Sequence, residues 1–160
     1  MEQVVLLIGG NIGNRLELIA QAEALLGEEF KVTGKSSIYE TEAWGGSSEG
    51  NYLNRALVLE VNREAEELLD ITQGIEDRLG RTRVKKWGDR TMDIDIIYFG
   101  EKIVDTDRLK VPHPFLAERR FVLEPLAEVL PDFIHPIFGK NNIELLRLCK
   151  DESKVEKLKP

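Results

Sequence analysis

Two aspartates stand two positions apart in an otherwise apolar segment. Residues 91–99 read TMDIDIIYF, which predicts a strand, and residues two apart in a strand point to the same face. Asp93 and Asp95 would therefore present their carboxylates together, with Cα atoms about 6–7 Å apart. Magnesium is commonly held by one or two carboxylates, with substrate phosphates and water completing its octahedron. The pair indicates a magnesium site, although two solvated aspartates on an outer face would give the same pattern.

A strongly basic segment immediately precedes this strand. Residues 81–90 read RTRVKKWGDR, with five Lys or Arg against one Asp, so the local charge is 5 − 1 = +4. Arginines bind phosphate oxygens through charge-assisted, often bidentate hydrogen bonds. A solvated basic loop is the ordinary explanation for such a run. Cations beside a two-carboxylate metal site, however, are what phosphate transfer from a magnesium nucleotide requires.

A third group of candidate residues is uncharged. Tyr52 and Asn54 are two apart in a predicted strand, and Thr41, Trp44 and Phe121 complete the group. An aromatic plane beside a carboxamide suits a flat heterocycle, because the ring stacks and the amide reads the donor and acceptor edge. Ordinary core packing of the aromatic residues is the alternative.

The hydrophobic pattern predicts the elements that position these residues. Strands are expected over 3–9, 30–40, 53–61 and 91–99. Helices are expected from an N-cap at Asn14 to Gly27, and over about 63–79, 119–129 and 142–148. A weak hairpin falls between residues 102 and 111, and the tail from residue 150 is expected to be loosely ordered.

The order βαββαβ, followed by C-terminal additions, predicts a ferredoxin-like α+β sandwich. In this fold two helices cover one face of an antiparallel sheet. A length of 160 residues fits a single domain over residues 1–160.

The composition of the chain argues against several classes of protein. The chain has 22 Lys and Arg and 29 Asp and Glu, a net charge of −7, which argues against a general nucleic-acid binder. One cysteine excludes an internal disulfide. The first apolar run, Val4 to Ile8, is too short for a membrane span and follows an acidic residue, unlike a signal peptide. We therefore expect a cytoplasmic protein with no membrane or nucleic-acid partner.

Several segments together resemble the 6-hydroxymethyl-7,8-dihydropterin pyrophosphokinase family. The matching stretches include LIGGNIGN at 7–14, NYLNRALVLE at 51–60, WGDRTMDIDIIYFG at 87–100, RLKVPHP at 108–114 and ERRFVLEPLAE at 118–128. The resemblance implies that the two terminal phosphates of ATP pass as one pyrophosphoryl group to the hydroxymethyl oxygen of the pterin, releasing AMP. It also implies ATP as co-substrate and two Mg²⁺ ions. We expect a monomer.

The resemblance implies three overlapping sets of site residues. The catalytic set is Arg81, Arg83, Arg90, Asp93 and Asp95, of which the two aspartates bind the metal ions. The ATP site is formed by Gln73, Glu76, Arg83, Trp87, Arg90, Ile96, Arg108, His113 and Arg119. The pterin site is formed by Thr41, Ala43, Trp44, Tyr52, Asn54 and Phe121.

Two other functions remain open at this point. A non-catalytic ferredoxin-like module that senses a nucleotide or metabolite would use the basic loop for binding and would need no metal. A single-stranded RNA binder on the same fold is disfavoured, because the chain is acidic and lacks adjacent aromatic residues on its sheet. The product formed from ATP distinguishes the enzyme from the binding module.

Overall fold

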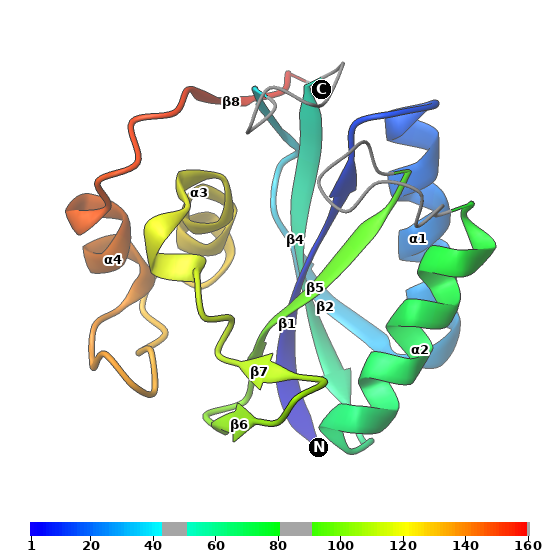
Figure 1. Ribbon diagram of the computed structural model, residues 1–160, viewed down its shortest axis with the longest axis horizontal. Helices are drawn as coiled ribbons and strands as arrows, with labels where there is room; N and C mark the ends of the chain where they lie inside the picture. Colours follow the sequence, from blue (N-terminus) through cyan, green and yellow to red (C-terminus); the bar gives the residue numbers. More distant parts are fainter. Residues whose placement is uncertain (43–50, 81–90, 160) are drawn as a thin grey trace.

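A computed structural model of the chain describes residues 1–42, 51–80 and 91–159 (Figure 1). The first part follows the predicted order, except that two strands replace the one expected over 30–40: β1 (Glu2–Gly10), α1 (Arg15–Glu29), β2 (Lys31–Lys35), β3 (Tyr39–Thr41), β4 (Tyr52–Val61), α2 (Ala65–Arg78) and β5 (Asp93–Phe99). The second part adds β6 (Val104–Asp105), β7 (Lys110–Val111), a 3-10 turn (Leu116–Glu118), α3 (Arg120–Val129), α4 (Asn142–Leu148) and β8 (Val155–Lys157). The α+β ferredoxin-like class and the β6–β7 hairpin are confirmed.

The sheet is antiparallel throughout, with the strand order β5-β1-β4-β3-β8 and with β2 also paired to β4. The central strand β1 is buried from Val4 to Gly10. A strand buried on both faces reads as a continuous apolar run, which explains VVLLI in this segment.

Helices cover both faces of the sheet (Figure 1). Alternate residues of β1 face opposite sides: Val4, Leu6 and Ile8 pack with α1 and α2, whereas Val5 and Leu7 pack with α3 and α4. Two helices on one face were expected, and α3 and α4 form the second layer. The face that α3 covers is called the α3 face below.

Two predicted boundaries are wrong. Helix α1 begins at its predicted cap, where the Asn14 side chain accepts a hydrogen bond from the Glu17 N–H, but it continues through Gly27 to Glu29. A single glycine in a helix costs about 1 kcal/mol, which tertiary packing overrides here. The strand expected over 30–40 is two strands, β2 and β3. The strand is interrupted at residues 36–38. It continues through Gly34, where the pairing with β4 only shifts register.

The tail is also more ordered than expected. Residues 155–157 form β8, which pairs with the outer edge of β3. Polar composition alone predicts a loose tail, but backbone hydrogen bonds to an available sheet edge do not depend on side-chain hydropathy.

A register shift between Val5 and Leu6 inserts one extra residue into β5. Ile94 and Ile96 consequently face α1 and α2, while Tyr98 faces α3 and α4, where its hydroxyl donates to Asn142 Oδ1 at 2.7 Å. This bond connects α4 to the sheet. Within the described ranges, no helix is long and apolar enough to cross a membrane.

Candidate functional site

The register of the sheet brings three site positions into one row. Gly9 of β1 lies opposite Asn54 of β4 on one side and opposite Asp93 of β5 on the other. Two residues earlier in β1, Leu7 lies between Ala56 of β4 and Asp95 of β5. Directly opposed residues share a face, and Leu7 and Ala56 pack in the core beneath α3, so both aspartates and Asn54 lie on the α3 face. Neighbouring strands are about 4.8 Å apart, which places the backbones of Asn54 and Asp93 roughly 10 Å apart.

Gly9 sits in the middle of this row because no side chain fits there. A Cβ atom at this position would lie 1.9 Å from the Leu53 carbonyl oxygen and 2.4 Å from Asn54 Oδ1. The Asn54 amide therefore lies beside the bare backbone of Gly9 and is buried there. Because Gly9 has no side chain, β1 leaves a low surface on the sheet between Asn54 and Asp93.

Thr41 ends β3 on the same face, opposite Tyr52 at the start of β4. Thr41 is only 2% exposed, yet its Oγ1 has no hydrogen-bond partner among the described residues. Leaving a buried hydroxyl unpaired costs about 1–3 kcal/mol. A ligand with a polar edge would satisfy it, as the predicted role in binding the pterin edge requires.

The start of α3 carries the opposing wall of the site. The Arg119 guanidinium lies 5.0 Å from the ring centroid of Phe115 and 5.9 Å from that of Phe121. Such cation–π contacts hold the arginine in place while leaving its donors available for an anion. Phe121 is half-buried against the core beneath α3 and remains partly accessible.

His113 lies in the segment between β7 and α3. Its backbone N–H donates to the Ile97 carbonyl at 3.0 Å, and its Nδ1 accepts the Phe115 N–H at 3.2 Å. Burial lowers the pKa of His113, and the nearby Arg119 charge lowers it further, to about 4. At neutral pH the ring is therefore uncharged and carries its proton on Nε2, which makes Nε2–H a hydrogen-bond donor.

Helix α2 contributes Glu76 and Gln73. Glu76 is 4% exposed, and its Oε2 accepts the Ile94 N–H at 2.7 Å, so the carboxylate covers the outer edge of β5 between the two aspartates. Gln73 is half-buried one turn earlier on the same helix. The side chain of Ile96 packs with α1 and α2, on the opposite face from Asp95. A contact of Ile96 with ATP would therefore have to come from its backbone at this edge.

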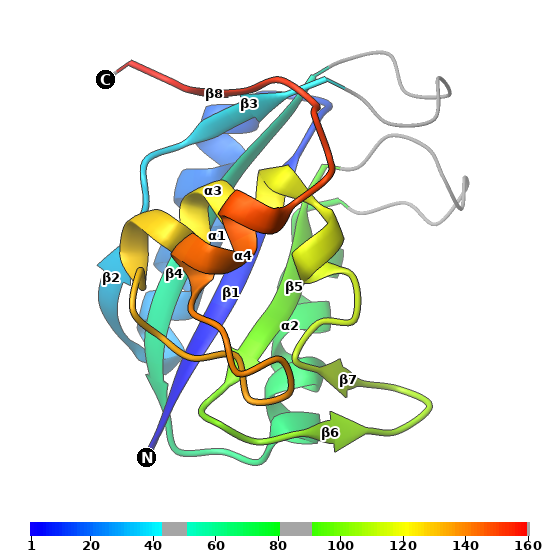
Figure 2. The same ribbon diagram turned by 90° about the vertical axis from the view of Figure 1, so that its left-hand side faces the viewer.

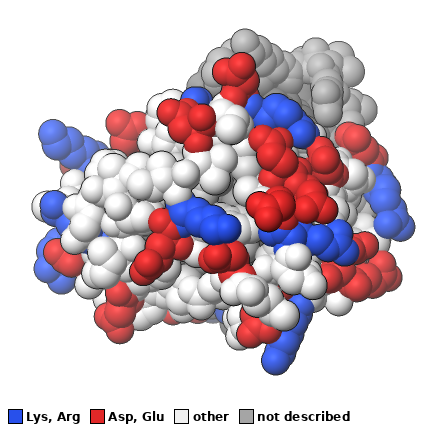
Figure 3. Space-filling view, turned by 90° about the horizontal axis from the view of Figure 1, so that it is seen from below, with Lys and Arg blue, Asp and Glu red and all other residues white. Residues whose placement is uncertain are grey.

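Arg108 is held by two carboxylates at some distance along α2. Its guanidinium pairs with Glu66 at 2.9 Å and with Asp70 at 2.6 Å, and the hydrogen bond that it donates to Asp70 raises the pKa of Arg108. Figure 3 shows acidic side chains gathered with basic ones beside them on this side of the molecule. The assignment of Arg108 to the ATP site stays a prediction.

Six predicted site residues lie outside the described residues: Ala43, Trp44, Arg81, Arg83, Trp87 and Arg90. Among the residues that are described, no group of three or more His, Cys, Asp or Glu could hold a metal ion. Asp93 and Asp95 are both partly exposed on one face, and their oxygens are hard ligands that suit Mg²⁺. The pair fits a magnesium ion whose remaining ligands come from phosphate and water.

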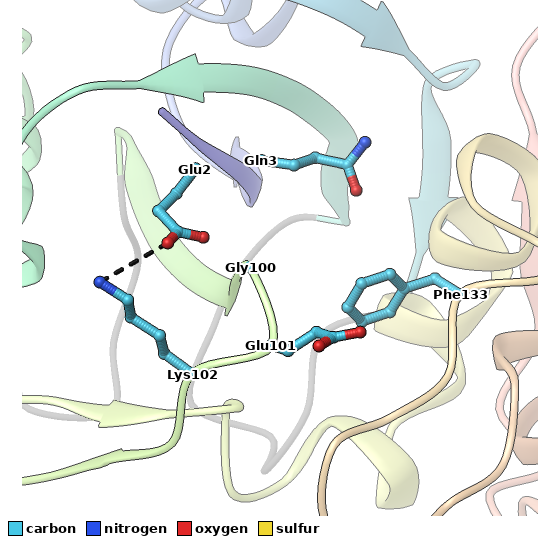
Figure 4. A pocket seen from close by; sticks show the side chains of 6 residues that line it. All are labelled: Glu2, Gln3, Gly100, Glu101, Lys102 and Phe133. Carbon is cyan, nitrogen blue, oxygen red and sulfur yellow. Dashed lines mark ion pairs between the residues drawn. The ribbon is translucent and has the colours of Figure 1, made fainter.

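A separate hollow of about 500 Å³ lies at the other end of β5 (Figure 4). It is lined by Glu2, Gln3, Gly100, Glu101, Lys102 and Phe133, and Lys102 pairs with Glu2 across it at 3.6 Å. None of these six residues is a predicted site residue. Asp93 begins β5 and Gly100 follows its end, so the strand separates the hollow from the aspartates by roughly 20 Å.

Sequence reasoning missed two residues near the site. Asn11 is a buried polar residue directly after β1. Arg15 donates from Nη1 to Glu40 Oε2 at 3.2 Å and to the Asn51 carbonyl at 2.9 Å, joining the end of β3 to the start of β4. A polar residue after a buried strand was a weak signal for Asn11. No local signal identified Arg15, because its partners are 25 and 36 residues away.

We predict that Gly9→Ala destabilises the protein by about 1–3 kcal/mol or more, because the new methyl group overlaps the β4 backbone. Gly34→Ala is the matched control in the same sheet: its Cβ would meet Val58 at 3.6 Å, an ordinary contact. Urea unfolding measures both. Equal stability of the two variants would show that the close approach at Gly9 is not a constraint.

We predict that His113 titrates near pH 4 and that Arg119→Gln raises its pKa, because the repelling charge is removed. The chain has two histidines, so NMR can follow both. Burial also lowers the pKa of His135, which serves as the control and should not respond to Arg119→Gln. Since the folded-state pKa of His113 lies below its usual 6.5, the unfolded chain binds the proton more readily. The free energy of unfolding therefore decreases as the pH falls from 6.5 to about 4. A His113 pKa near 6.5 would contradict this account.

Comparison with known proteins identifies the family. The sequence profile of the 7,8-dihydro-6-hydroxymethylpterin-pyrophosphokinase (HPPK) family matches residues 5–131. A 2-amino-4-hydroxy-6-hydroxymethyldihydropteridine pyrophosphokinase from Aquifex aeolicus is 40% identical over 140 residues, which cover 88% of this chain and 88% of the relative. The enzyme of the same name from Bacillus subtilis is 46% identical over 124 residues, covering 76% of this chain and 74% of the relative.

A solved structure supports the fold independently. Plasmodium falciparum HPPK-DHPS with pteroate superposes with a TM-score of 0.73 at 14% identity, covering 91% of this chain and 42% of that chain. This chain thus spans less than half of that longer protein, and the likeness bears on the fold alone. From the profile and the sequence relatives, the chain belongs to the 7,8-dihydro-6-hydroxymethylpterin-pyrophosphokinase family, the ATP-dependent pyrophosphokinases of folate biosynthesis.

Proposed function

We propose that the α3 face at the Asp93 end of β5 transfers a pyrophosphoryl group from ATP to 6-hydroxymethyl-7,8-dihydropterin. The observation that carries the proposal is the row Asn54–Gly9–Asp93, which sets an amide that can read a heterocycle next to carboxylates that can hold a metal. Family membership supplies the reaction class, and this row supplies a place where both substrates can meet.

The pterin ring would lie over the low surface at Gly9. Tyr52 and Phe121 supply its aromatic neighbours. Asn54 and the hydroxyl of Thr41, which has no partner among the described residues, pair with its polar edge. Ala43 and Trp44 complete the proposed pterin site from the segment that follows β3. A site built to pair polar edges discriminates strongly against rings that lack them.

The triphosphate would lie between the aspartates and the start of α3. His113 Nε2–H and the Arg119 guanidinium are the described donors, and Arg81, Arg83 and Arg90 are the proposed donors from the basic segment. A neutral histidine and fixed arginines act by positioning and by stabilising negative charge, which dominates catalysis of phosphoryl transfer. Gln73, Glu76, Trp87, Arg108 and the Ile96 backbone would border the nucleotide.

Asp93 and Asp95 would hold two Mg²⁺ ions together with the triphosphate. Magnesium bound there supplies charge neutralisation for the phosphate oxygens. In the transfer, the pterin hydroxymethyl oxygen forms a bond to the β-phosphorus, and the bond from that phosphorus to the α–β bridging oxygen breaks. The hydroxyl proton is released, AMP leaves with the bridging oxygen, and the pterin keeps the two terminal phosphates.

We also propose that the protein acts as a monomer in the cytoplasm, without nucleic-acid or membrane partners. All proposed substrate contacts come from a single chain. The net charge of −7 supports the exclusion of nucleic acid.

The nucleotide product tests the function directly. With ATP, Mg²⁺ and the reduced pterin alcohol, we expect AMP and the pterin pyrophosphate in equal amounts. ADP would indicate an ordinary kinase, and the absence of any product would favour the sensing module. Either result would overturn the proposal.

We predict that Asp95→Asn lowers kcat by about 10³-fold or more, because the metal loses a charged ligand, while the Kd for the pterin changes less than about threefold. Asp107→Asn makes the same charge change on an exposed loop and should leave kcat unchanged. Rapid-quench analysis of AMP gives kcat, and calorimetry gives the pterin Kd. Near-normal AMP formation by Asp95→Asn would refute the assignment of the metal site.

A further inference from the structure

The C-terminal tail, residues 150–159, contacts both walls of the proposed substrate site. It leaves α4, passes the first turn of α3 and ends along the outer edge of β3 (Figure 2). The family profile matches only residues 5–131, so it assigns this tail no role.

The first contact is a strand pairing. Val155 of β8 lies opposite Thr41, and Lys157 lies opposite Tyr39. The sheet rows therefore continue as Val155–Thr41–Tyr52 and Lys157–Tyr39–Asn54, so β8 extends the two rows that carry the proposed pterin residues. Beyond the strand, the Leu158 N–H donates to the Ile38 carbonyl at 2.7 Å, and both side chains pack against the core.

The pairing matters because β3 is only three residues long. One edge of β3 pairs with β4 and the other with β8. Short strands are held by their neighbours and not by their own propensity. Without β8, the backbone that presents Thr41 would be fixed from one side only.

The second contact is made by Asp151. Its Oδ2 accepts the Arg120 N–H at 3.0 Å, and its Oδ1 accepts the N–H and the hydroxyl of Ser153 at 2.9 and 2.5 Å. The residue at the N-cap of α3, Arg119, provides no side-chain cap of its own. Asp151 thus caps the helix from 31 residues away, which is favourable because a carboxylate complements a helix N-terminus.

The capped residue lies between two proposed substrate residues. Arg120 is flanked by Arg119, proposed to bind phosphate, and by Phe121, proposed to contact the pterin. Burial raises the pKa of Asp151, but its hydrogen bonds with Ser153 and the Arg120 backbone lower the pKa more, so the group is ionised at neutral pH.

We propose that the tail is a positioning element of the substrate site, in which β8 fixes Thr41 and Asp151 fixes the turn that carries Arg119 and Phe121. The inference rests on the proposed function, because it concerns residues assigned to substrate there. It adds two positioning parts to that site, neither of which touches substrate.

Removal of residues 155–160 tests the strand. We expect the KM for the pterin to rise about tenfold or more while the KM for ATP stays within about twofold, because small displacements of positioning groups have large effects. Removal of residues 159–160 alone is the control and should leave both values unchanged. A folded truncated protein with an unchanged pterin KM would overturn the role of β8.

Asp151→Ala tests the cap without shortening the chain. If the truncated protein does not fold, this variant tests whether the tail positions the substrate site. We expect the KM values for both substrates to rise about tenfold, since Arg119 and Phe121 share the turn, and Asp151→Asn to restore them in part by keeping an acceptor oxygen. Glu152→Ala removes the same charge from an exposed neighbour and should change neither KM. A loss of thermal stability in Asp151→Ala with both KM values unchanged would show a merely structural cap and overturn the proposal.

The two proposals fail in distinguishable ways. If the wild-type protein forms no AMP, the proposed function fails. If the wild type forms AMP and the tail variants match it in both KM values, the function stands and the inference about the tail is wrong.

Discussion

The antiparallel hydrogen-bond ladder that joins β4, β1 and β5 determines where the described part of the site lies. The register sets Asn54, Gly9 and Asp93 side by side, and a shift of one residue would turn the aspartates into the core beneath α1 and α2. The extra residue in β5 lies between the aspartates and Tyr98, so the strand can present carboxylates at one end and a core tyrosine at the other. The helices pack on the two faces of the sheet around this ladder, the β6–β7 hairpin follows β5, and the tail pairs with β3.

The charge of the protein is unevenly distributed along the sequence. The chain carries a net charge of −7, while residues 81–90 alone carry +4. Among the described cations, Arg108, Lys102 and Lys110 are each paired with a carboxylate away from the aspartates of β5. Arg119 instead lies over aromatic rings, which fix its position without neutralising it. The acidic net charge disfavours binding of general polyanions, and the few cations of the proposed site would bind a single triphosphate.

Local sequence pattern predicted the parts of the site that depend on one element. Alternation in residues 91–99 placed Asp93 and Asp95 on one face, and a ferredoxin-like order followed from the spacing of apolar runs. The row Asn54–Gly9–Asp93, the Arg15 bridge and the Asp151 cap could not be predicted, because each depends on pairing between distant segments. The tail was misjudged for the same reason, since β8 is ordered by its pairing with the edge of β3, a distant segment of the chain.

The most direct test of the account is a crystal structure with the pterin alcohol, Mg²⁺ and an ATP analogue whose α–β bridge cannot be cleaved. We expect the pterin ring over Gly9, with its edge on Asn54 and Thr41, and the triphosphate between Asp93, Asp95 and Arg119. A pterin bound elsewhere, for example in the hollow beside Glu2 and Lys102, or a triphosphate away from both aspartates, would contradict it.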